Sequence, residues 1–302
     1  MLRIEELQAL LETIEHNTAL FQERHFIERT DVLDLIEFHV MDALNTACID
    51  GIQPQRCTAL RKRAIALRDE FKQINHHLVH RLQDNIRSGK YGHRQLMNEF
   101  RRYAHITART RKVGDLAYDS LDVLVNAVLS SEPLPEEEVD MEPEMVAYQP
   151  TPARVILDMI DQTGVDAHDV FFDIGSGLGH VPIVVSLLSG AEAIGIEFQR
   201  AYCEYARQCA TGLNLPHVRF FHQDAREADF STGTIFYMYT PFKGAMLQAV
   251  LARLHDEAQK RQIRVCTYGP YMADVAKQPW LTALNRSNAT NSPITVFKSS
   301  KR

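Results

Sequence analysis

The stretch FFDIGSGLGHVPIVVSLL at residues 171–188 contains an apolar segment, a turn with three glycines and a second apolar segment. This pattern predicts a buried strand, a sharp turn and a helix in succession. Gly175, Gly177 and Gly179 let the main chain turn tightly and leave it open to a ligand, because a Cβ atom there would intrude. The sequence therefore predicts that a ligand lies against this turn.

The spacing of the glycines distinguishes two kinds of nucleotide site. A dinucleotide-binding turn has the pattern GxGxxG, which would place a glycine where this chain has His180. The chain has GxGxG instead, after an acidic residue at the end of the strand, and this resembles the first motif of class I S-adenosylmethionine-dependent methyltransferases. The resemblance implies S-adenosyl-L-methionine as the cofactor, with the acid near its amino acid portion. The residues so implied are Asp173, Gly175, Ser176, Gly177 and Gly179.

Short apolar segments alternate with helical segments after residue 150, which predicts a parallel sheet with crossover helices. The expected strands lie at 169–174, 191–197, 217–223, 234–240, 262–268, 280–284 and 292–299. Together with the resemblance, this predicts an α/β fold. Its core would be a Rossmann-like, seven-stranded, mostly parallel sheet whose last strand is antiparallel.

Two more acids follow predicted strands. Glu197 ends the second strand of the sheet, where a carboxylate can accept hydrogen bonds from ribose hydroxyls. Because the carboxyl ends of parallel strands meet at one edge, Asp173, Glu197 and Asp224 are expected to line one crevice. The resemblance adds that Phe198 packs against the adenine and that Asp224 and the amide of Ala225 bind the edge of that ring.

The fourth strand ends in YMYTPFKG at 237–244. In class I methyltransferases this position borders the transferred methyl group, and many that modify nitrogen have Asn/Asp-Pro-Pro-aromatic there. This chain keeps one proline and the aromatic residue. The catalytic residues that the resemblance implies are Tyr239, Thr240, Pro241 and Phe242. A loop aromatic that packs under the sheet edge would explain Phe242 equally well.

The segment MVAYQPTP at 145–152 comes just before the first helix of this region. In related enzymes such a segment folds over the methionine end of the cofactor, which makes Tyr148, Gln149 and Thr151 candidate contacts. Thr151 followed by Pro152 is also typical of a helix N-cap with proline at the first helical position, which needs no ligand.

The combination of DIGSGLGHVPI at 173–183 with IGIE at 194–197 is similar to that of histone lysine methyltransferases that lack a SET domain. The chain lacks the Asn-Asn-Phe type fourth motif of that subgroup. The resemblance to class I enzymes in general extends over residues 146–299. A histone acceptor does not follow from these motifs, so the acceptor stays open between a small molecule and a protein side chain.

The first part of the chain has helical periodicity up to about residue 130, which predicts an all-α helical bundle. The following SSEPLPEEEVDMEPE has seven acids, three prolines and no base, which is typical of a linker. The expected domains are a helical bundle at 1–130, an acidic linker at 131–145 and a methyltransferase domain at 146–302. Residues 1–50 have a net charge of −8 and residues 51–130 one of +8, so we expect acidic and basic helix faces to pair with each other.

Other features of the 302 residues limit the function classes. No apolar segment approaches the ~20 residues that cross a bilayer, and the acidic residues near the N-terminus argue against a secretory leader, so we expect a cytoplasmic protein without a membrane partner. Five cysteines without metal-type spacing argue against a disulfide framework or a zinc ribbon, and no metal is expected. His76, His77 and His80 have a spacing that could bind zinc, but exposed histidines are the simpler interpretation. Arg101, Arg102 and Tyr103 leave a nucleic-acid partner open.

The expected function is that of a methyltransferase (EC 2.1.1.-) that moves a methyl group to a nitrogen or oxygen acceptor by in-line displacement. One alternative is a non-catalytic protein that binds S-adenosylmethionine as a sensor while its helical domain binds a partner. A second is a nicotinamide-dependent oxidoreductase, which His180 in place of the third glycine disfavours.

Overall fold

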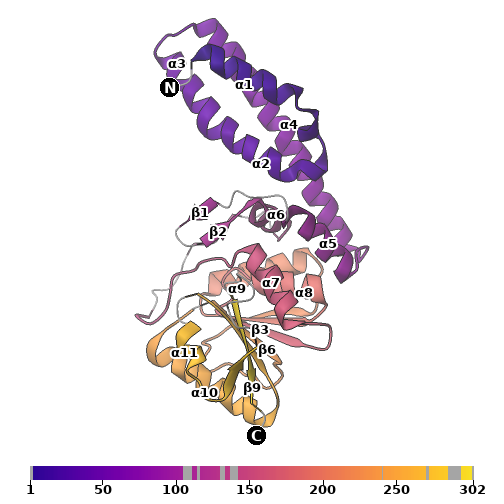
Figure 1. Ribbon diagram of the computed structural model, residues 1–302, viewed down its shortest axis with the longest axis vertical. Helices are drawn as coiled ribbons and strands as arrows, with labels where there is room; N and C mark the ends of the chain where they lie inside the picture. The colour runs from indigo at the N-terminus through magenta and orange to yellow at the C-terminus, as the bar shows by residue number, and fades with distance from the viewer. Residues whose placement is uncertain are drawn as a thin grey trace.

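A distal group of helices lies at one end of the molecule and a helix-covered sheet at the other (Figure 1). This computed structural model describes residues 3–104, 111–113, 116–129, 133–136, 142–239, 241–269, 272–284 and 294–300. The N-terminus belongs to the distal helices, and the C-terminal strand belongs to the sheet.

The distal helices enclose a core of their own. They are α1 (Ile4–His16), the short turns η1 (Thr18–Phe21) and η2 (Glu23–His25), α2 (Phe26–Leu35), a π-helical turn η3 (Ile36–Val40), α3 (Met41–Ile49) and the first part of α4 (Pro54–Arg87). Leu7, Leu44 and Phe71 are fully buried in this core. With 34 residues α4 is about 50 Å long, and its buried side chains belong to the distal core up to Phe71 and to the core of the sheet domain from Leu78 onwards.

The opposite charges of the first two parts of the chain pair across the distal helices. Each of four acids in the first fifty residues contacts a base of α4, at 2.5 to 3.2 Å. The pairs are Glu5 with Arg56, Glu15 with Arg63, Glu37 with Lys72 and Glu23 with Arg81. This confirms the expectation that the acidic and basic helix faces neutralise each other.

The second part of the helical half packs on the sheet domain. It consists of the end of α4, α5 (His93–Ala104), a hairpin of β1 (Arg111–Val113) and β2 (Leu116–Tyr118), and α6 (Ser120–Leu129). Leu82, Phe100 and Leu124 belong to the same buried cluster as the sheet residue Phe171. The hairpin departs from the all-α expectation. The domain boundaries stay a prediction, but buried side chains on both sides of residues 131–145 share one core.

The sheet has the expected number of strands, and neighbouring strands are parallel or antiparallel as expected. Its strands are β3 (Val170–Ile174), β4 (Glu192–Glu197), β5 (Val218–His222), β6 (Ile235–Tyr239), β7 (Arg264–Tyr268), β8 (Leu281–Ala283) and β9 (Ile294–Ser299). The order is β5-β4-β3-β6-β7-β9-β8, with β9 antiparallel to both of its neighbours and the strands from β5 to β7 parallel. The fold class is confirmed, and every expected strand agrees with its observed bounds within two residues.

Helices cover both faces of the sheet. The buried cluster of one face includes α7 (Ala153–Thr163), α8 (His180–Ser189) and α9 (Arg200–Gly212). That of the other includes α10 (Gly244–Lys260) and α11 (Met272–Ala276). Neighbouring residues such as Phe171 and Phe172 belong to opposite clusters, as alternation along a strand requires. Because α8 follows β3 on one face and α10 follows β6 on the other, a crevice is expected where these two strands end.

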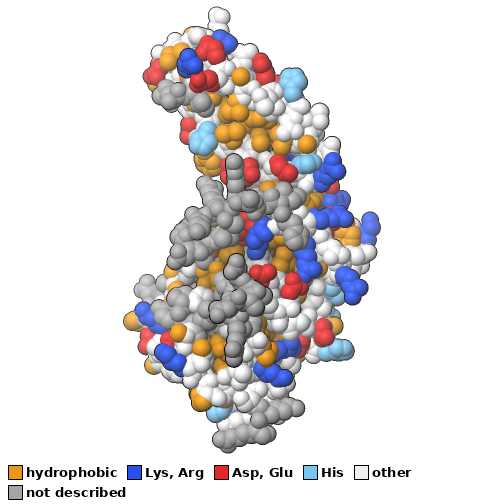
Figure 2. All heavy atoms as spheres, in the orientation of Figure 1, with side chains coloured by type: hydrophobic (Ala, Val, Ile, Leu, Met, Phe, Trp, Pro, Cys, Tyr) orange, Lys and Arg blue, Asp and Glu red, His pale blue; other side chains and the backbone are white. Residues whose placement is uncertain are grey.

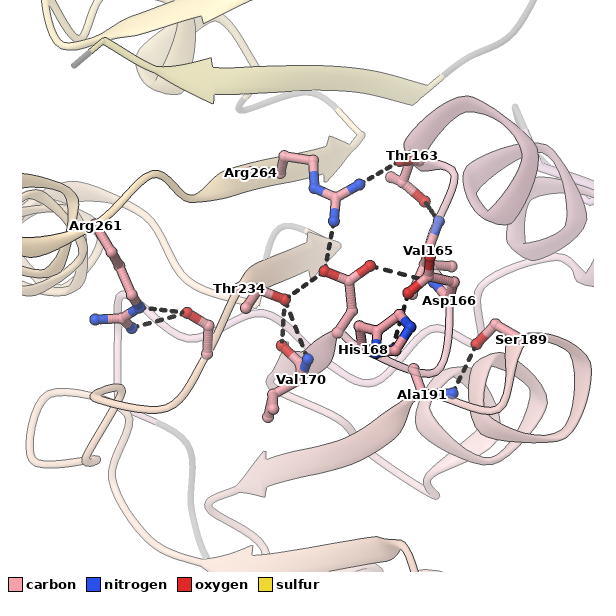
Figure 3. A network of polar contacts seen from close by, with 12 residues as sticks. Thr163, Val165, Asp166, His168, Val170, Ser189, Ala191, Thr234, Arg261 and Arg264 are labelled. Carbon is pink, nitrogen blue, oxygen red and sulfur yellow. Dashed lines mark hydrogen bonds and ion pairs between the residues drawn. The ribbon is translucent and has the colours of Figure 1, made fainter.

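A polar network fixes the opposite edge of the sheet (Figure 3). The side chain of Asp169, just before β3, accepts hydrogen bonds from the Thr234 hydroxyl at 2.7 Å and from the Arg264 guanidinium at 2.5 Å. Arg264 also donates to the carbonyl oxygen of Thr163 at the end of α7. This network joins the amino ends of β3, β6 and β7 to one another. A ligand site is therefore expected at the opposite ends of these strands, which are their carboxyl ends.

The histidines of α4 and the cysteines are of residue types that can bind metals. His76, His77 and His80 are exposed on α4, and the five cysteines are free thiols. Within the ranges described, no three or more His, Cys, Asp or Glu side chains are grouped so as to hold a metal ion. None of the helices described here has the length and apolar character needed to cross a membrane.

Candidate cofactor site

A cavity lies at the carboxyl ends of β3, β4, β5 and β6, and a segment of chain that precedes α7 crosses it. Fourteen of the sixteen residues predicted from the sequence line this cavity: Tyr148, Gln149, Thr151, Asp173, Gly175, Ser176, Gly177, Glu197, Phe198, Asp224, Ala225, Tyr239, Pro241 and Phe242. Thr240 lies outside the described residues. The three acids at the strand ends therefore share one cavity, as the parallel register predicts.

The glycine turn is the floor of the cavity. Gly175 and Gly177 have φ angles of 82° and 51°, which a residue with a side chain rarely adopts. A Cβ atom on Gly175 would lie 2.4 Å from the Cβ of Pro241, and one on Gly177 would lie 2.2 Å from the ring of Tyr148. The amides of Gly175 and Ser176 both donate to the carbonyl oxygen of Ile196 in β4, which fixes the turn to the sheet.

Gly179 differs from the other two glycines and does not line the cavity. Its φ angle is 81°, and a Cβ atom there would lie 2.6 Å from Ala206 of α9 and 2.7 Å from Phe220 of β5. The third glycine is therefore required by packing between the turn, the next helix and the outer strand. A contact between Gly179 and the cofactor stays a prediction.

Asp173 is a buried acid whose carboxylate has no hydrogen-bond partner in the part of the chain that is described. Its side chain is 3% exposed. Burial, and to a smaller extent the carboxylate of Glu197, raise the pKa of Asp173 well above its ordinary range. An uncompensated carboxyl group of this kind is costly to ionise, so a positively charged ligand group beside it would be stabilised.

Glu197 is also buried, but main-chain amides stabilise its carboxylate. Its two oxygens accept hydrogen bonds from the amides of Gly177 and Gln199, each at 2.7 Å. Burial raises the pKa of Glu197, and these two hydrogen bonds oppose that effect. A carboxylate oxygen can accept more than one hydrogen bond, so both remain able to accept from a pair of hydroxyls.

Asp224 is held by a partner that the sequence interpretation did not identify. Arg226 donates from its main-chain amide at 2.7 Å and from its guanidinium at 2.5 to 3.0 Å to the Asp224 carboxylate. The same guanidinium contacts Glu142 at 2.8 Å. The Arg226 hydrogen bonds hold the pKa of Asp224 below its ordinary value, so this acid is ionised at neutral pH. Arg226 thereby joins the end of β5 to the segment that crosses the cavity.

Residues 142–151, which we call the crossing segment, run over the carboxyl edge of the sheet. Near its start the carboxylate of Glu144 accepts from the amides of Ala245 and Met246 at the beginning of α10. At its centre the ring of Tyr148 lies over Gly177, with its hydroxyl 3.4 Å from Nδ1 of His180. The segment therefore forms a cover over the glycine turn.

Thr151 does not cap α7, so the N-cap interpretation is wrong. Pro152 is the N-cap residue, and the helix begins at Ala153. The hydroxyl of Thr151 instead lies 2.9 Å from that of Tyr237, which is the residue of β6 beside Asp173. The amide that a threonine cap would satisfy donates to Asp122 of α6. A capping side chain from the helical half has replaced the local one.

The loop after β6 approaches the cavity with two aromatic residues. The Tyr239 hydroxyl donates to Gln149 of the crossing segment at 3.2 Å, and the Tyr239 ring packs on Tyr268 with centroids 4.5 Å apart. Phe242 is buried in the cluster on the α10 side and pairs with Met145 through a main-chain bridge. Both interpretations of Phe242 therefore hold in part, since it lines the cavity and also packs under the edge of the sheet.

Several cavity residues were not predicted as site residues. They include His180, Tyr202, Tyr237 and Gln223. His180 begins α8 directly after the glycine turn, and burial lowers its pKa to about 4, so its ring is neutral at pH 7. Its place after the turn was the one available signal. Tyr237 and Tyr202 resemble ordinary core positions of a strand and a helix.

The structure corrects one part of the interpretation of Arg101, Arg102 and Tyr103, which is the role of Tyr103 as a stacking surface, while a nucleic-acid partner stays a prediction. Figure 2 shows Lys and Arg side chains gathered on the right of the view, at the level of α5. Arg101 and Arg102 pair with Asp161 and Glu99. Tyr103 is 4% exposed and packs against Phe26, so its ring cannot stack on a base.

A family model matches the part of the chain that borders most of the cavity. Residues 145–239, which include the crossing segment from Met145 and β3 to β6, match the model of the family described as histone methylation protein DOT1. No curated protein is significantly similar in sequence. The recognition of class I methyltransferase motifs, with similarity to non-SET histone methyltransferases, is therefore confirmed.

Similar solved structures include an RNA methyltransferase from Salinibacter ruber in complex with S-adenosyl-L-homocysteine, which is 25% identical, covers 50% of this chain and 92% of its own, and has a TM-score of 0.42. A precorrin-6y C5,15-methyltransferase from Geobacter metallireducens is 15% identical, with coverage of 52% and 94% and a TM-score of 0.40. A magnesium protoporphyrin IX methyltransferase from Synechocystis with bound S-adenosylmethionine is 13% identical, with coverage of 49% and 77% and a TM-score of 0.38. The strand order is that of a Rossmann-like sheet, and the family match covers its strands β3 to β6.

Proposed function

We propose that this protein is an S-adenosylmethionine-dependent methyltransferase that transfers a methyl group to a nitrogen or oxygen acceptor. The observation that supports this most strongly is the convergence of Asp173, Glu197 and Asp224 with the glycine turn on one cavity. In an open α/β sheet this is the edge at which ligands bind.

The chemistry of the cavity fits the cofactor. The Asp173 carboxyl, which has no hydrogen-bond partner among the described residues, matches the positive charge of the amino acid and sulfonium end. Glu197 is able to accept the two ribose hydroxyls, and Phe198 and Asp224 offer an apolar face and an acceptor for the adenine. The buried hydroxyl of Ser176 has no hydrogen-bond partner within the described ranges and lies against Gly195 of β4, so Ser176 borders the cavity with its other atoms.

The residues of this chain would act mainly by binding and orientation. S-adenosylmethionine, when bound, supplies a methyl group on a sulfonium, which is a reactive electrophile that needs no protein nucleophile. Placing an acceptor atom in line with that group can be worth roughly 7–11 kcal/mol of the barrier. In this proposal Tyr239, Pro241 and Phe242 border the acceptor, and the crossing segment excludes water from it.

The tyrosines beside the cavity are not suited to remove a proton. Burial raises the pKa of both Tyr148 and Tyr239, so their hydroxyls stay neutral and act as hydrogen-bond donors or acceptors. An acceptor that arrives deprotonated needs no general base. The acceptor therefore stays open between a small molecule and a protein side chain, and a nucleic-acid acceptor and the cytoplasmic location stay predictions.

Two other functions make different predictions. A nicotinamide-dependent dinucleotide fold has the strand order 3-2-1-4-5-6, whereas this sheet places the antiparallel β9 between β7 and β8. A non-catalytic sensor would bind the cofactor without turnover.

Calorimetric titration with S-adenosylhomocysteine and with NADH separates the first alternative from the proposal, which expects binding of the former alone. Incubation with methyl-labelled S-adenosylmethionine and cell extract tests catalysis, with Asp173→Asn as the matched inactive control. Binding of S-adenosylhomocysteine without a labelled product in any extract would favour the sensor, and binding of NADH alone would refute the proposal.

A further inference from the structure

Two residues of the helical half hold the end of the crossing segment. Tyr118, at the end of β2, donates a hydrogen bond from its hydroxyl to the carbonyl oxygen of Pro150 at 2.6 Å. Asp122 of α6 accepts a hydrogen bond from the amide of Ala153 at 2.7 Å. These contacts connect residues that are more than thirty positions apart in the sequence, and they join the helical half to the cover of the cavity.

A third residue strengthens this connection. Asp119 forms an ion pair with Arg154 in the first turn of α7, and its side chain is almost fully buried. Its amide donates to Asp122 at 2.6 Å, so the two acids are fixed relative to each other. We call Tyr118, Asp119 and Asp122 the clasp. None of the three lines the cavity, so we expect them to act on a ligand through the crossing segment and the start of α7.

The crossing segment is also fixed at its other end. The amide of Val146 donates to the carbonyl oxygen of Pro241 at 3.0 Å, and the carboxylate of Glu144 accepts from two amides at the beginning of α10. Between these two ends, the main chain of residues 147–149 makes no hydrogen bond to other described residues. The segment is therefore a short span whose main chain is held at its two ends, while the side chains of Tyr148 and Gln149 contact His180 and Tyr239 between them.

The side chain at the centre of this span covers the glycine turn. The ring of Tyr148 lies so close to Gly177 that a Cβ atom there would be 2.2 Å from it, so no ligand atom fits between them. A ligand that contacts the main chain of Gly177 requires the ring to move. Because the ends of the span are fixed, that movement depends on how firmly the contacts at each end hold.

We propose that the clasp holds the crossing segment closed over the glycine turn and so sets the rates at which the cofactor enters and leaves. The clasp residues are positioning residues, since they touch the crossing segment and α7 rather than the cavity. The inference rests on the proposed function in one respect, which is that the ligand is the adenosyl cofactor. The closing of the segment itself does not depend on it.

Tyr118→Phe tests the clasp with the smallest change, because it removes one hydroxyl and keeps the ring. Tyr91→Phe is the matched control, since the Tyr91 hydroxyl accepts a hydrogen bond from Arg81 within the helical half and makes no contact with the crossing segment. Without added ligand, we expect amide hydrogen exchange at Val146 and Ala153, whose amides donate hydrogen bonds at the two ends of the span, to be about tenfold faster in Tyr118→Phe. The control should exchange as the wild type does.

Binding of S-adenosylhomocysteine provides the second readout. Its dissociation and association rates, measured by stopped-flow methods, should both rise about tenfold in Tyr118→Phe, with a smaller change in the dissociation constant and with Tm close to that of the control. Asp122→Asn should act in the same direction. Unchanged exchange in both clasp variants, or faster exchange with unchanged ligand rates, would overturn the inference. Faster exchange in a protein that binds no S-adenosylhomocysteine would support the closing role and refute the proposed function.

Discussion

Replacing Asp173 with asparagine should stabilise the fold while it removes cofactor binding. Asp173 is buried and has no hydrogen-bond partner among the described residues, and its pKa is raised by burial and by Glu197. Each unit by which the folded-state pKa exceeds the unfolded value costs the folded state about 1.4 kcal/mol at pH values above both. Asparagine has nearly the same shape and no charge to bury, so it avoids this cost.

The sign of the effect depends on pH. Below about pH 3, the carboxyl group is protonated in both the folded and the unfolded state, and the variant should match the wild type. As the pH rises towards the raised pKa, the unfolded chain ionises first and the wild type loses stability relative to Asp173→Asn. At pH 8 we expect the variant to be more stable by more than about 1 kcal/mol, which corresponds to a Tm at least about 2 °C higher.

Thermal unfolding at pH 5 and pH 8, with S-adenosylhomocysteine titrations of the same samples, measures both effects. The expected result is a Tm difference that grows with pH together with at least a tenfold loss of affinity in the variant, because the charged partner of the ligand is gone. A variant that is less stable at pH 8, or one that binds as tightly as the wild type, would refute the assignment of Asp173 as an unpaired acid that awaits a cationic ligand.

Three other substitutions separate binding from structure. Glu197→Gln should weaken S-adenosylhomocysteine binding at least tenfold in calorimetry, because its amide nitrogen would face a main-chain N–H; unchanged affinity would contradict a ribose contact. Gly179→Ala should lower the free energy of unfolding by about 2 kcal/mol or more, because the new Cβ would lie 2.6 Å from Ala206. The control Gly164→Ala has open space around the new Cβ and should lower it by about 1 kcal/mol. Equal losses in denaturant unfolding would show that packing at Gly179 is irrelevant. Arg29→Met should destabilise the distal helices by about 3 kcal/mol, since the buried guanidinium donates to Asn75 and to the carbonyl oxygens of Leu20 and Gln22. A Tm equal to that of the wild type would contradict a stabilising role of these hydrogen bonds.

The sheet could be predicted because its information is local. Buried parallel strands are continuous apolar segments bounded by turn residues, and this holds for VFFDI at 170–174 and for IFYMY at 235–239. The convergence of Asp173, Glu197 and Asp224 followed from the same geometry, since parallel strands end at one edge. Those inferences needed strand positions and directions but no side-chain conformations.

The remainder of the site depends on contacts that no local pattern specifies. Gly177 and Gly179 occur at alternate positions of the same motif, and both have a positive φ angle. A Cβ atom on Gly177 would nevertheless meet Tyr148, whereas one on Gly179 would meet Ala206 and Phe220. Thr151 has the position of a helix cap, but a hydroxyl in β6 is its partner and an acid of α6 caps the helix. Tertiary packing decides between such alternatives.

The helical half shows the same limit on a larger scale. Its periodicity correctly predicts helices, but periodicity does not say which core an apolar face joins. Leu7 and Phe71 belong to the distal core, whereas Leu82 and Leu124 belong to the core of the sheet domain. The hairpin of β1 and β2 has strands of three residues each, which are too short to give a clear alternating pattern.

A crystal structure with S-adenosylhomocysteine bound is the most direct measurement of the central claim. We predict that its ribose hydroxyls lie within hydrogen-bonding distance of Glu197, its amino group beside Asp173 and its adenine between Phe198 and Asp224, with the ring of Tyr148 moved from Gly177. Ligand bound elsewhere on the protein, or bound at this edge with Asp173 and Glu197 out of reach, would contradict it.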